Sequence, residues 1–365
     1  MKDIFKEYDP VDDNIFRIID NDGKVINKDW KPDLSDDQLL EAFKFMQFAR
    51  KADLMAVSYQ RQGRMYTYPP NLGQEAIAAA AGDNMTDKDW LVPAFRELGA
   101  WLKKGAKLRD LFLYFGGHED GSKFSGAPNF LPSSVPIASQ LLHATGIGYA
   151  VKYKKEKSVV FAFVGDGGTS QGDFHEALNF AAVWKAPVIF IVQNNQYAIS
   201  LPFSKQTVSK NVAIKSVAYG MKGIKVDGND YMAMYQAVAE AKKYALAGNG
   251  PVLIEGLTYR TGAHTTSDDP SLYRTSEEEK QWAEKDPIDR LEKYLISKKK
   301  WKKKDEEALL DGFKKEIEKE FSAYENYPAY KLDDAFQFLY DDMPDDLKQQ
   351  KIDHEKFLNW KELSK

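Results

Sequence analysis

The sequence predicts an α/β fold, with a mostly parallel sheet, helices on both faces of that sheet, and a helical C-terminal appendage. Three observations predict it. Apolar stretches rich in β-branched and aromatic residues, typical of strands buried on both faces, alternate with stretches of helical length. A Gly-rich turn directly follows one of these strands. Residues 276–365 are charged and helical in pattern. Alternating strands and helices form βαβ units, which build parallel sheets.

The first part of the chain is expected to be mostly helical. Residues 1–33 are polar and irregular, and we interpret them as an N-terminal extension. Ser35, followed by acidic and then apolar residues, predicts a helix that runs to about Gln62. The Gly- and Pro-rich segments 68–73 and 116–136 are interpreted as connecting or functional loops between helices.

The alternation of strands and helices begins near residue 157. Strands are predicted at 158–164, 188–193, 224–227 and 251–257, and helices at 172–185, 208–219 and 230–247. We therefore expect one α/β domain over residues 34–275 and a helical appendage over residues 276–365. The run SKKKWKKKDEE in the appendage leads directly into acidic residues, which favours a solvated junction between helices over a nucleic-acid site.

The composition excludes several classes of protein and site. A net charge of −4 gives no general reason to expect nucleic acid or a membrane as a partner. Cysteine is absent, which excludes disulfides, thiolate metal sites and cysteine nucleophiles and fits a reducing cytoplasm. No stretch offers about 20 consecutive apolar residues, and MKDIFKEYDP lacks the apolar core of a secretory signal. We expect a soluble, cytoplasmic protein.

The stretch VVFAFVGDGGTSQGDF carries the first functional signal. Asp166 follows the predicted strand at its carboxyl end, which is where open α/β sheets bind ligands. Three glycines that allow close approaches of the backbone surround it, namely Gly165, Gly167 and Gly168. On this stretch alone, a ligand site and a tight turn with Asp166 as a helix N-cap are equally compatible with the residues.

The next predicted strand supplies the second half of the signal. VIFIVQNNQYAIS includes Asn194 and Asn195 at the end of its apolar run. A right-handed crossover brings the carboxyl ends of two parallel strands to one edge of a sheet, so Asp166 and Asn195 can converge. Their oxygens suit Mg²⁺ or Ca²⁺, and a Gly-rich turn before a helix N-terminus favours an anion. The pair predicts a metal–diphosphate site; the alternative is that the asparagines only cap a strand and a turn.

The motif GDG, followed across a strand–helix–strand by NN, resembles the thiamine-diphosphate motif. The sequence around this motif, together with YRTGAHTTSDDPSLYR, is similar to the alpha subunits of the heterotetrameric 2-oxo acid dehydrogenases. The resemblance extends from about Leu34 to the C-terminus. The resemblance implies the thiamine-diphosphate-binding fold and the oxidative decarboxylation of a 2-oxo acid, with transfer of the acyl group to a lipoyl group. Pyruvate is the expected substrate; branched-chain 2-oxo acids and acetoin are the alternatives.

The resemblance implies roles for particular residues. Asp166 and Asn195 match side-chain ligands of Mg²⁺, and Tyr197 matches the residue whose backbone carbonyl is a third ligand. The glycines Gly165, Gly167 and Gly168 match the turn that holds the diphosphate of thiamine diphosphate.

Three further matches lie outside the two strands. Arg96, in VPAFRELG, matches an arginine next to the diphosphate, a task suited to a permanently charged guanidinium. Ile137 matches an apolar residue beside the cofactor. His264 matches the histidine of a mobile loop at the entrance of the active site and is our catalytic candidate. His118 is interpreted as part of a surface turn, and His143 either faces the cofactor or packs.

The resemblance also implies partners. In this family the glutamate that activates the aminopyrimidine of the cofactor is carried by a separate beta subunit. We therefore expect an α₂β₂ heterotetramer, with a lipoyl acyltransferase component as acceptor, and a chain that is inactive alone.

Two hypotheses of other classes remain open. A nucleotide-binding protein could use the Gly-rich turn as a phosphate loop, although Ser170 stands at the third position of G-x-G-x-x-G and no Walker lysine follows. A non-catalytic scaffold subunit would keep Asp166 and Asn195 only as relics.

Overall fold

The computed structural model describes residues 3–30, 32–124 and 126–363 of the chain. Parts of three predicted segments lie outside the described residues, namely residues 1–2 and 31 of the N-terminal extension, residue 125 of a loop, and residues 364–365 of the appendage. The chain divides into two compact units between Phe321 and Ser322. The limits expected for the α/β domain, at residues 34 and 275, stay a prediction.

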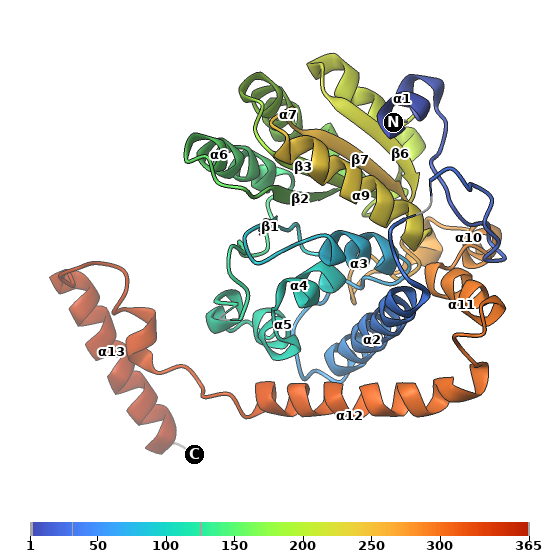
Figure 1. Ribbon diagram of the computed structural model, residues 1–365. Helices are drawn as coiled ribbons and strands as arrows, with labels where there is room; N and C mark the ends of the chain where they lie inside the picture. Colours follow the sequence, from blue (N-terminus) through green and yellow to red (C-terminus); the bar gives the residue numbers. More distant parts are fainter. Residues whose placement is uncertain (1–2, 31, 125, 364–365) are drawn as a thin grey trace. The chain divides into compact units, whose positions relative to one another are not determined.

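A five-stranded parallel sheet forms the centre of the first unit, and the predicted α/β fold is confirmed (Figure 1). Its strands, in spatial order, are β1 (Trp90–Val92), β2 (Val160–Gly165), β3 (Val188–Asn194), β7 (Val252–Leu257) and β6 (Lys222–Asp227). All seven residues of β3 are buried, because the strand has helices on both faces. The sequence pattern did not predict β1, whose three residues are too few to show a periodicity.

Helices cover both faces of the sheet. On one face, α6 (Ser139–Tyr153) and α7 (Gly172–Trp184) pack side by side over β2 and β3, as Figure 1 shows in green. On the other face, α9 (Tyr231–Leu246) and α3 (Glu75–Asp83) pack against each other and against the strands. Side chains of α3 and α9 reach the sheet at Gly256, where an added Cβ would lie 2.7 Å from Ile77.

The longest helix of the first unit, α2 (Asp36–Arg61), begins and ends close to the predicted limits. Ser35 accepts a hydrogen bond from the backbone of Gln38, whose side chain in turn accepts one from the backbone of Ser35, which completes a capping box. The other short helices and strands of this unit are α1 (Ile4–Glu7), α4 (Leu98–Lys104), α5 (Leu108–Phe115), β4 (Tyr197–Ala198), β5 (Leu201–Pro202), α8 (Phe203–Gln206), α10 (Ser276–Ala283) and α11 (Pro287–Ser297).

The helix expected over 208–219 is only partly correct. The helical residues are restricted to Ala213–Tyr219 and form a 3₁₀ helix. The buried carboxylate of Glu255, on β7, accepts hydrogen bonds from the backbone N–H groups of Val212 and Ala213 at 2.7 and 2.9 Å. A tertiary contact thus fixes where this helix begins, and local sequence periodicity does not contain that information.

The N-terminal extension is not a loose segment. Phe16 pairs with Val226 on β6, and the backbone N–H groups of Ile18 and Ile19 both donate to Asp230 at 2.7 Å. These apolar residues are buried, so the described part of the extension packs against the α/β fold.

The predicted lysine-rich junction lies between α11, which ends at Ser297, and α12 (Glu306–Glu325). Trp301 in this junction is buried and donates to Glu292, and Lys303 also pairs with Glu292.

The second unit contains α13 (Asp345–Leu363), where Lys351 forms an ion pair with Asp333. No helix formed by the described residues is both long and apolar enough to cross a membrane. The expected cytoplasmic location stays a prediction.

Candidate functional site

A cavity of about 260 Å³ lies at the carboxyl ends of β2 and β3. Each of the nine residues predicted from the sequence lines this one cavity: Arg96, Ile137, Gly165, Asp166, Gly167, Gly168, Asn195, Tyr197 and His264. They come from five separate stretches of the chain. The fold therefore brings together the residues that the two strand ends and the resemblance had selected.

Asp166 is the buried carboxylate of the cavity. It follows β2 directly and begins a 3₁₀ helix (Asp166–Ser170), and only 1% of its surface is exposed. Its Oδ2 accepts a hydrogen bond from Nε2 of Gln206 at 2.8 Å, whereas its Oδ1 has no hydrogen-bond partner among the described residues. Burial raises the pKa of Asp166 to about 6. A buried carboxylate oxygen without a partner is costly, and a cation would satisfy it.

Asn195 and Tyr197 line the cavity directly after the end of β3. Asn195 donates from Nδ2 to Gln74 at 3.1 Å, and its Oδ1 accepts from the backbone N–H of Tyr197 at 3.3 Å. Asn194 does not line the cavity, because its side chain donates to Glu255 inside the fold at 2.7 Å. Of the two asparagines singled out in the sequence, only Asn195 is therefore available to a ligand.

Two glycines of the turn have no room for a larger side chain. A Cβ on Gly167 would lie 2.6 Å from the Cβ of Ala198, and one on Gly168 would overlap Cγ2 of Val164. A Cβ on Gly165 meets nothing within 4 Å, so it would project into open space where the residue lines the cavity. This turn leads into the N-terminus of α7, where backbone N–H groups favour an anion.

The oxygen atoms around Asp166 fit a hard divalent cation. A carboxylate, an amide oxygen and a backbone carbonyl are ligands that Mg²⁺ accepts, and Mg²⁺ usually keeps further positions for water and phosphate. Across residues 3–30, 32–124 and 126–363, no group of three His, Cys, Asp or Glu side chains is placed to hold a metal ion. A metal here would therefore need ligands other than these four kinds of side chain, such as an amide oxygen or a backbone carbonyl.

Arg96 and His264 contact each other in the wall of the cavity. One Nη of Arg96 donates to the backbone oxygen of His264 at 2.9 Å and lies 3.3 Å from its Nδ1, and the other donates to the backbone oxygen of Pro70. Burial, followed by the charges of Arg96 and Arg260, lowers the pKa of His264 to about 4. Because arginine only donates, Nδ1 is the acceptor and the proton of the neutral ring is on Nε2.

Sequence reasoning missed two charged residues of the cavity. Arg260 donates to the backbone oxygens of Tyr197 and Ile199 at 3.2 and 2.6 Å. Glu97 is fully buried, accepts from Gln193 at 2.7 Å, and has its pKa raised to about 7 by burial. Arg260 precedes His264 within the quoted loop and Glu97 is adjacent to Arg96, so proximity to matched residues was the available signal.

Two other histidines are not part of the cavity. His118 directly precedes a short 3₁₀ turn, Glu119–Ser122, and its ring accepts from the backbone N–H of Asp120. His143 is exposed on α6 and does not line the cavity.

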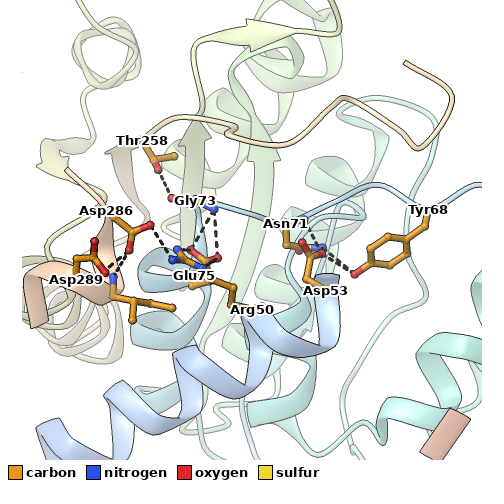
Figure 2. A network of polar contacts seen from close by, with 10 residues as sticks. Arg50, Asp53, Tyr68, Asn71, Gly73, Glu75, Thr258, Asp286 and Asp289 are labelled. Atoms are coloured by element: carbon orange, nitrogen blue, oxygen red, sulfur yellow. Dashed lines mark hydrogen bonds and ion pairs between the residues drawn. The ribbon is translucent and has the colours of Figure 1, made fainter. Parts of the chain in front are cut away.

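A buried polar network holds the loop 68–75 behind the cavity, and Figure 2 shows it from close by. From α2, Asp53 accepts from the hydroxyl of Tyr68 at 2.8 Å and from the backbone of Asn71 at 2.7 Å. Asn71 in turn accepts from the backbone N–H of Leu98, two residues after Arg96. The network therefore connects α2 to the segment that carries Arg96.

The second half of the network in Figure 2 holds the same loop from its other end. Arg50 binds both oxygens of Glu75, at 2.8 and 2.9 Å, and also Asp286 at 2.7 Å. Glu75 accepts from the backbone N–H of Gly73, whose carbonyl accepts from Thr258 at 2.9 Å. Gln74 lies between Gly73 and Glu75 in the chain, so these contacts hold it in place beside Asn195.

Comparisons with known proteins find relatives over most of the chain. A family model described as "Dehydrogenase E1 component" matches residues 43–333. A curated protein of Acholeplasma laidlawii named "Pyruvate dehydrogenase E1 component subunit alpha" is 46% identical over 341 residues, which cover 93% of this chain and 99% of the relative. Proteins of the same name from Staphylococcus aureus and Staphylococcus epidermidis are 41% and 40% identical over 335 residues, covering 92% of this chain and 90% of each relative.

Proposed function

We propose, from the premise that this chain belongs to the dehydrogenase E1 component family, that it is the alpha subunit of the enzyme that oxidatively decarboxylates pyruvate and passes the acetyl group to a lipoyl group. One observation carries the proposal. In a chain that covers 99% of a relative named for this activity, the nine residues predicted from the sequence line a single cavity at the carboxyl edge of the sheet.

The cofactor of the proposed reaction is thiamine diphosphate, on which the family depends. When bound, it supplies the nucleophilic carbon and the electron sink that decarboxylation of a 2-oxo acid needs. The chain's contribution is to bind and orient its diphosphate. The turn leaves open space at Gly165, where a group can approach the backbone closely, and Arg96 adds a buried positive charge to the same cavity.

We assign a magnesium ion to the same site. Asp166, Asn195 and the backbone carbonyl of Tyr197 are the proposed ligands from this chain. The unpartnered Oδ1 of Asp166 supports the assignment, since a cation would satisfy it. The remaining ligands would be phosphate oxygens and water.

His264 is the proposed catalytic residue. Its neutral ring holds a proton on Nε2 and lines the cavity, so it can donate a hydrogen bond to a phosphate or to a developing negative charge. Ile137 contributes an apolar side chain to the same cavity.

The chain is proposed to act with partners. Its relatives are named as alpha subunits, which supports a companion beta subunit, and we propose an α₂β₂ heterotetramer that works with a lipoyl acyltransferase component. The beta subunit would supply the glutamate that activates the cofactor.

Reconstitution with the beta subunit tests the substrate. With thiamine diphosphate and Mg²⁺ present, the rate of turnover of pyruvate should exceed that of 2-oxoisovalerate or acetoin. Equal or greater activity on 2-oxoisovalerate would show that pyruvate is not the preferred substrate. This outcome is open to test because closely related substrate pockets differ by only a few side chains.

A further inference from the structure

A short segment after β4 returns to the buried carboxylate of the site. β4 and β5 pair as an antiparallel hairpin, and α8 follows directly. The backbone N–H of Phe203 donates to the carbonyl of Gln196 at 2.8 Å, which folds α8 back toward the Gly-rich turn. This path brings Gln206, the last residue of α8, to Asp166.

Gln206 contacts one oxygen of Asp166 and leaves the other free. Its Nε2 donates to Oδ2 at 2.8 Å and also lies 3.3 Å from the carbonyl of Leu201. Because an ionised carboxylate only accepts hydrogen bonds, the NH₂ group of the amide must face it. Oδ1 of Asp166 remains without a hydrogen-bond partner within the part of the chain that the structure describes.

The amide of Gln206 is not explained by packing. Its Oε1 is buried and has no partner among the described residues, and a buried acceptor without a partner destabilises a fold. An apolar side chain of the same length would fill this space without that penalty. The same Oε1 lies 3.8 Å from the Cβ position of Gly167, so the whole amide group is next to the turn.

We propose that Gln206 is a positioning residue that holds Oδ2 of Asp166 and thereby directs Oδ1 toward the magnesium ion of the proposed site. This inference rests on the proposed function, since it needs a metal at Asp166. Partners behind a metal ligand fix its orientation, and their loss weakens metal affinity by about 10- to 100-fold. The contact also couples the conformation of residues 199–206 to the metal site.

Titration of Mg²⁺ into the complex of this chain with its beta subunit, at saturating thiamine diphosphate, tests the proposal. Gln206→Met keeps the length of the side chain and removes the donor, and Gln206→Glu keeps the shape and places a second carboxylate beside Asp166. Lys205→Gln, at the exposed neighbouring position on α8, is the matched control.

We expect the apparent dissociation constant of Mg²⁺ to rise about tenfold in Gln206→Met, which loses the donor, with no change in the control. In Gln206→Glu the added negative charge attracts the cation, so the dissociation constant should rise less than in Gln206→Met. Activity lost at low Mg²⁺ should return as Mg²⁺ is raised, which separates weaker metal binding from a general loss of the fold. Wild-type Mg²⁺ affinity in Gln206→Met would overturn the proposal. A wild-type complex that binds thiamine diphosphate without any need for Mg²⁺ would overturn the metal assignment itself.

Discussion

The guanidinium of Arg96 donates to the backbone oxygen of His264 at 2.9 Å and lies 3.3 Å from Nδ1 of the same residue. This contact joins the segment before α4 to the loop after β7. The same loop is also held by Asp268, which accepts from the backbone N–H of His264 at 2.7 Å and from the hydroxyl of Tyr273. A change at Arg96 should therefore affect both the charge of the cavity and the position of His264.

Arg96→Lys should weaken the binding of thiamine diphosphate by about tenfold or more. Lysine keeps the positive charge but loses the planar fork that contacts Pro70 and His264 at once. Isothermal titration of the complex with its beta subunit measures the affinity. Arg61→Lys, at the exposed end of α2, is the control, and equal affinity in Arg96→Lys and Arg61→Lys would refute the role given to Arg96.

The ring of His264 should stay neutral across the physiological pH range. Because burial lowers its pKa to about 4, the unfolded chain takes up a proton between pH 6.5 and 4 that the folded protein does not. The stability linked to this group is thus fully present above about pH 6.5 and decreases as the pH falls toward 4. NMR titration, with the signal assigned by its loss in His264→Gln, should show no midpoint near 6.5; a midpoint there would contradict the buried, neutral ring.

Gly167→Ala should destabilise the protein and weaken metal and cofactor binding together. The new Cβ would lie 2.6 Å from the Cβ of Ala198, and overpacking of this kind costs about 1–3 kcal/mol. Relief of the clash displaces β4, which carries the carbonyl of Tyr197. Chemical denaturation and calorimetry measure the two effects. Gly146→Ala, in open space on α6, should be neutral or slightly stabilising, and an equal loss in both variants would contradict the steric explanation.

Asp53→Ala should lower the free energy of unfolding by about 3 kcal/mol, because Tyr68 and Asn71 then lose a shared buried acceptor. Tyr68→Phe removes only one of the donors and should cost about 1 kcal/mol. Urea denaturation measures both. The cofactor affinity of Asp53→Ala should also fall, since Asn71 connects Asp53 to the segment of Arg96. Equal stabilities of the two variants would show that the network does not depend on Asp53.

The sequence predicted the centre of the site because two simple rules determine it. Asp166 and Asn195 follow neighbouring buried strands, and parallel strands joined by a crossover end at the same edge of a sheet. The residues themselves thus indicated that these two side chains could converge. Arg96, Ile137 and His264 were found through the resemblance alone, because loops of irregular path carry them to the cavity.

The residues that were missed depend on tertiary contacts. Gln206 reaches Asp166 only because a two-residue hairpin reverses the chain, and Gln74 reaches Asn195 only because buried charges on α2 hold its loop. Neither segment has a periodicity that local reasoning can use. The 3₁₀ helix Ala213–Tyr219 is a similar case, since Glu255, far along the chain, determines where it begins.

Calorimetric titration of the complex between this chain and its beta subunit tests the central claim most directly. We predict saturable binding of thiamine diphosphate that requires Mg²⁺, no comparable binding of NAD or ATP, and loss of the thiamine diphosphate signal in Asp166→Ala. Binding of NAD or ATP in its place, or an affinity for thiamine diphosphate that neither removal of Mg²⁺ nor Asp166→Ala changes, would contradict the assignment of this cavity as a metal–diphosphate site.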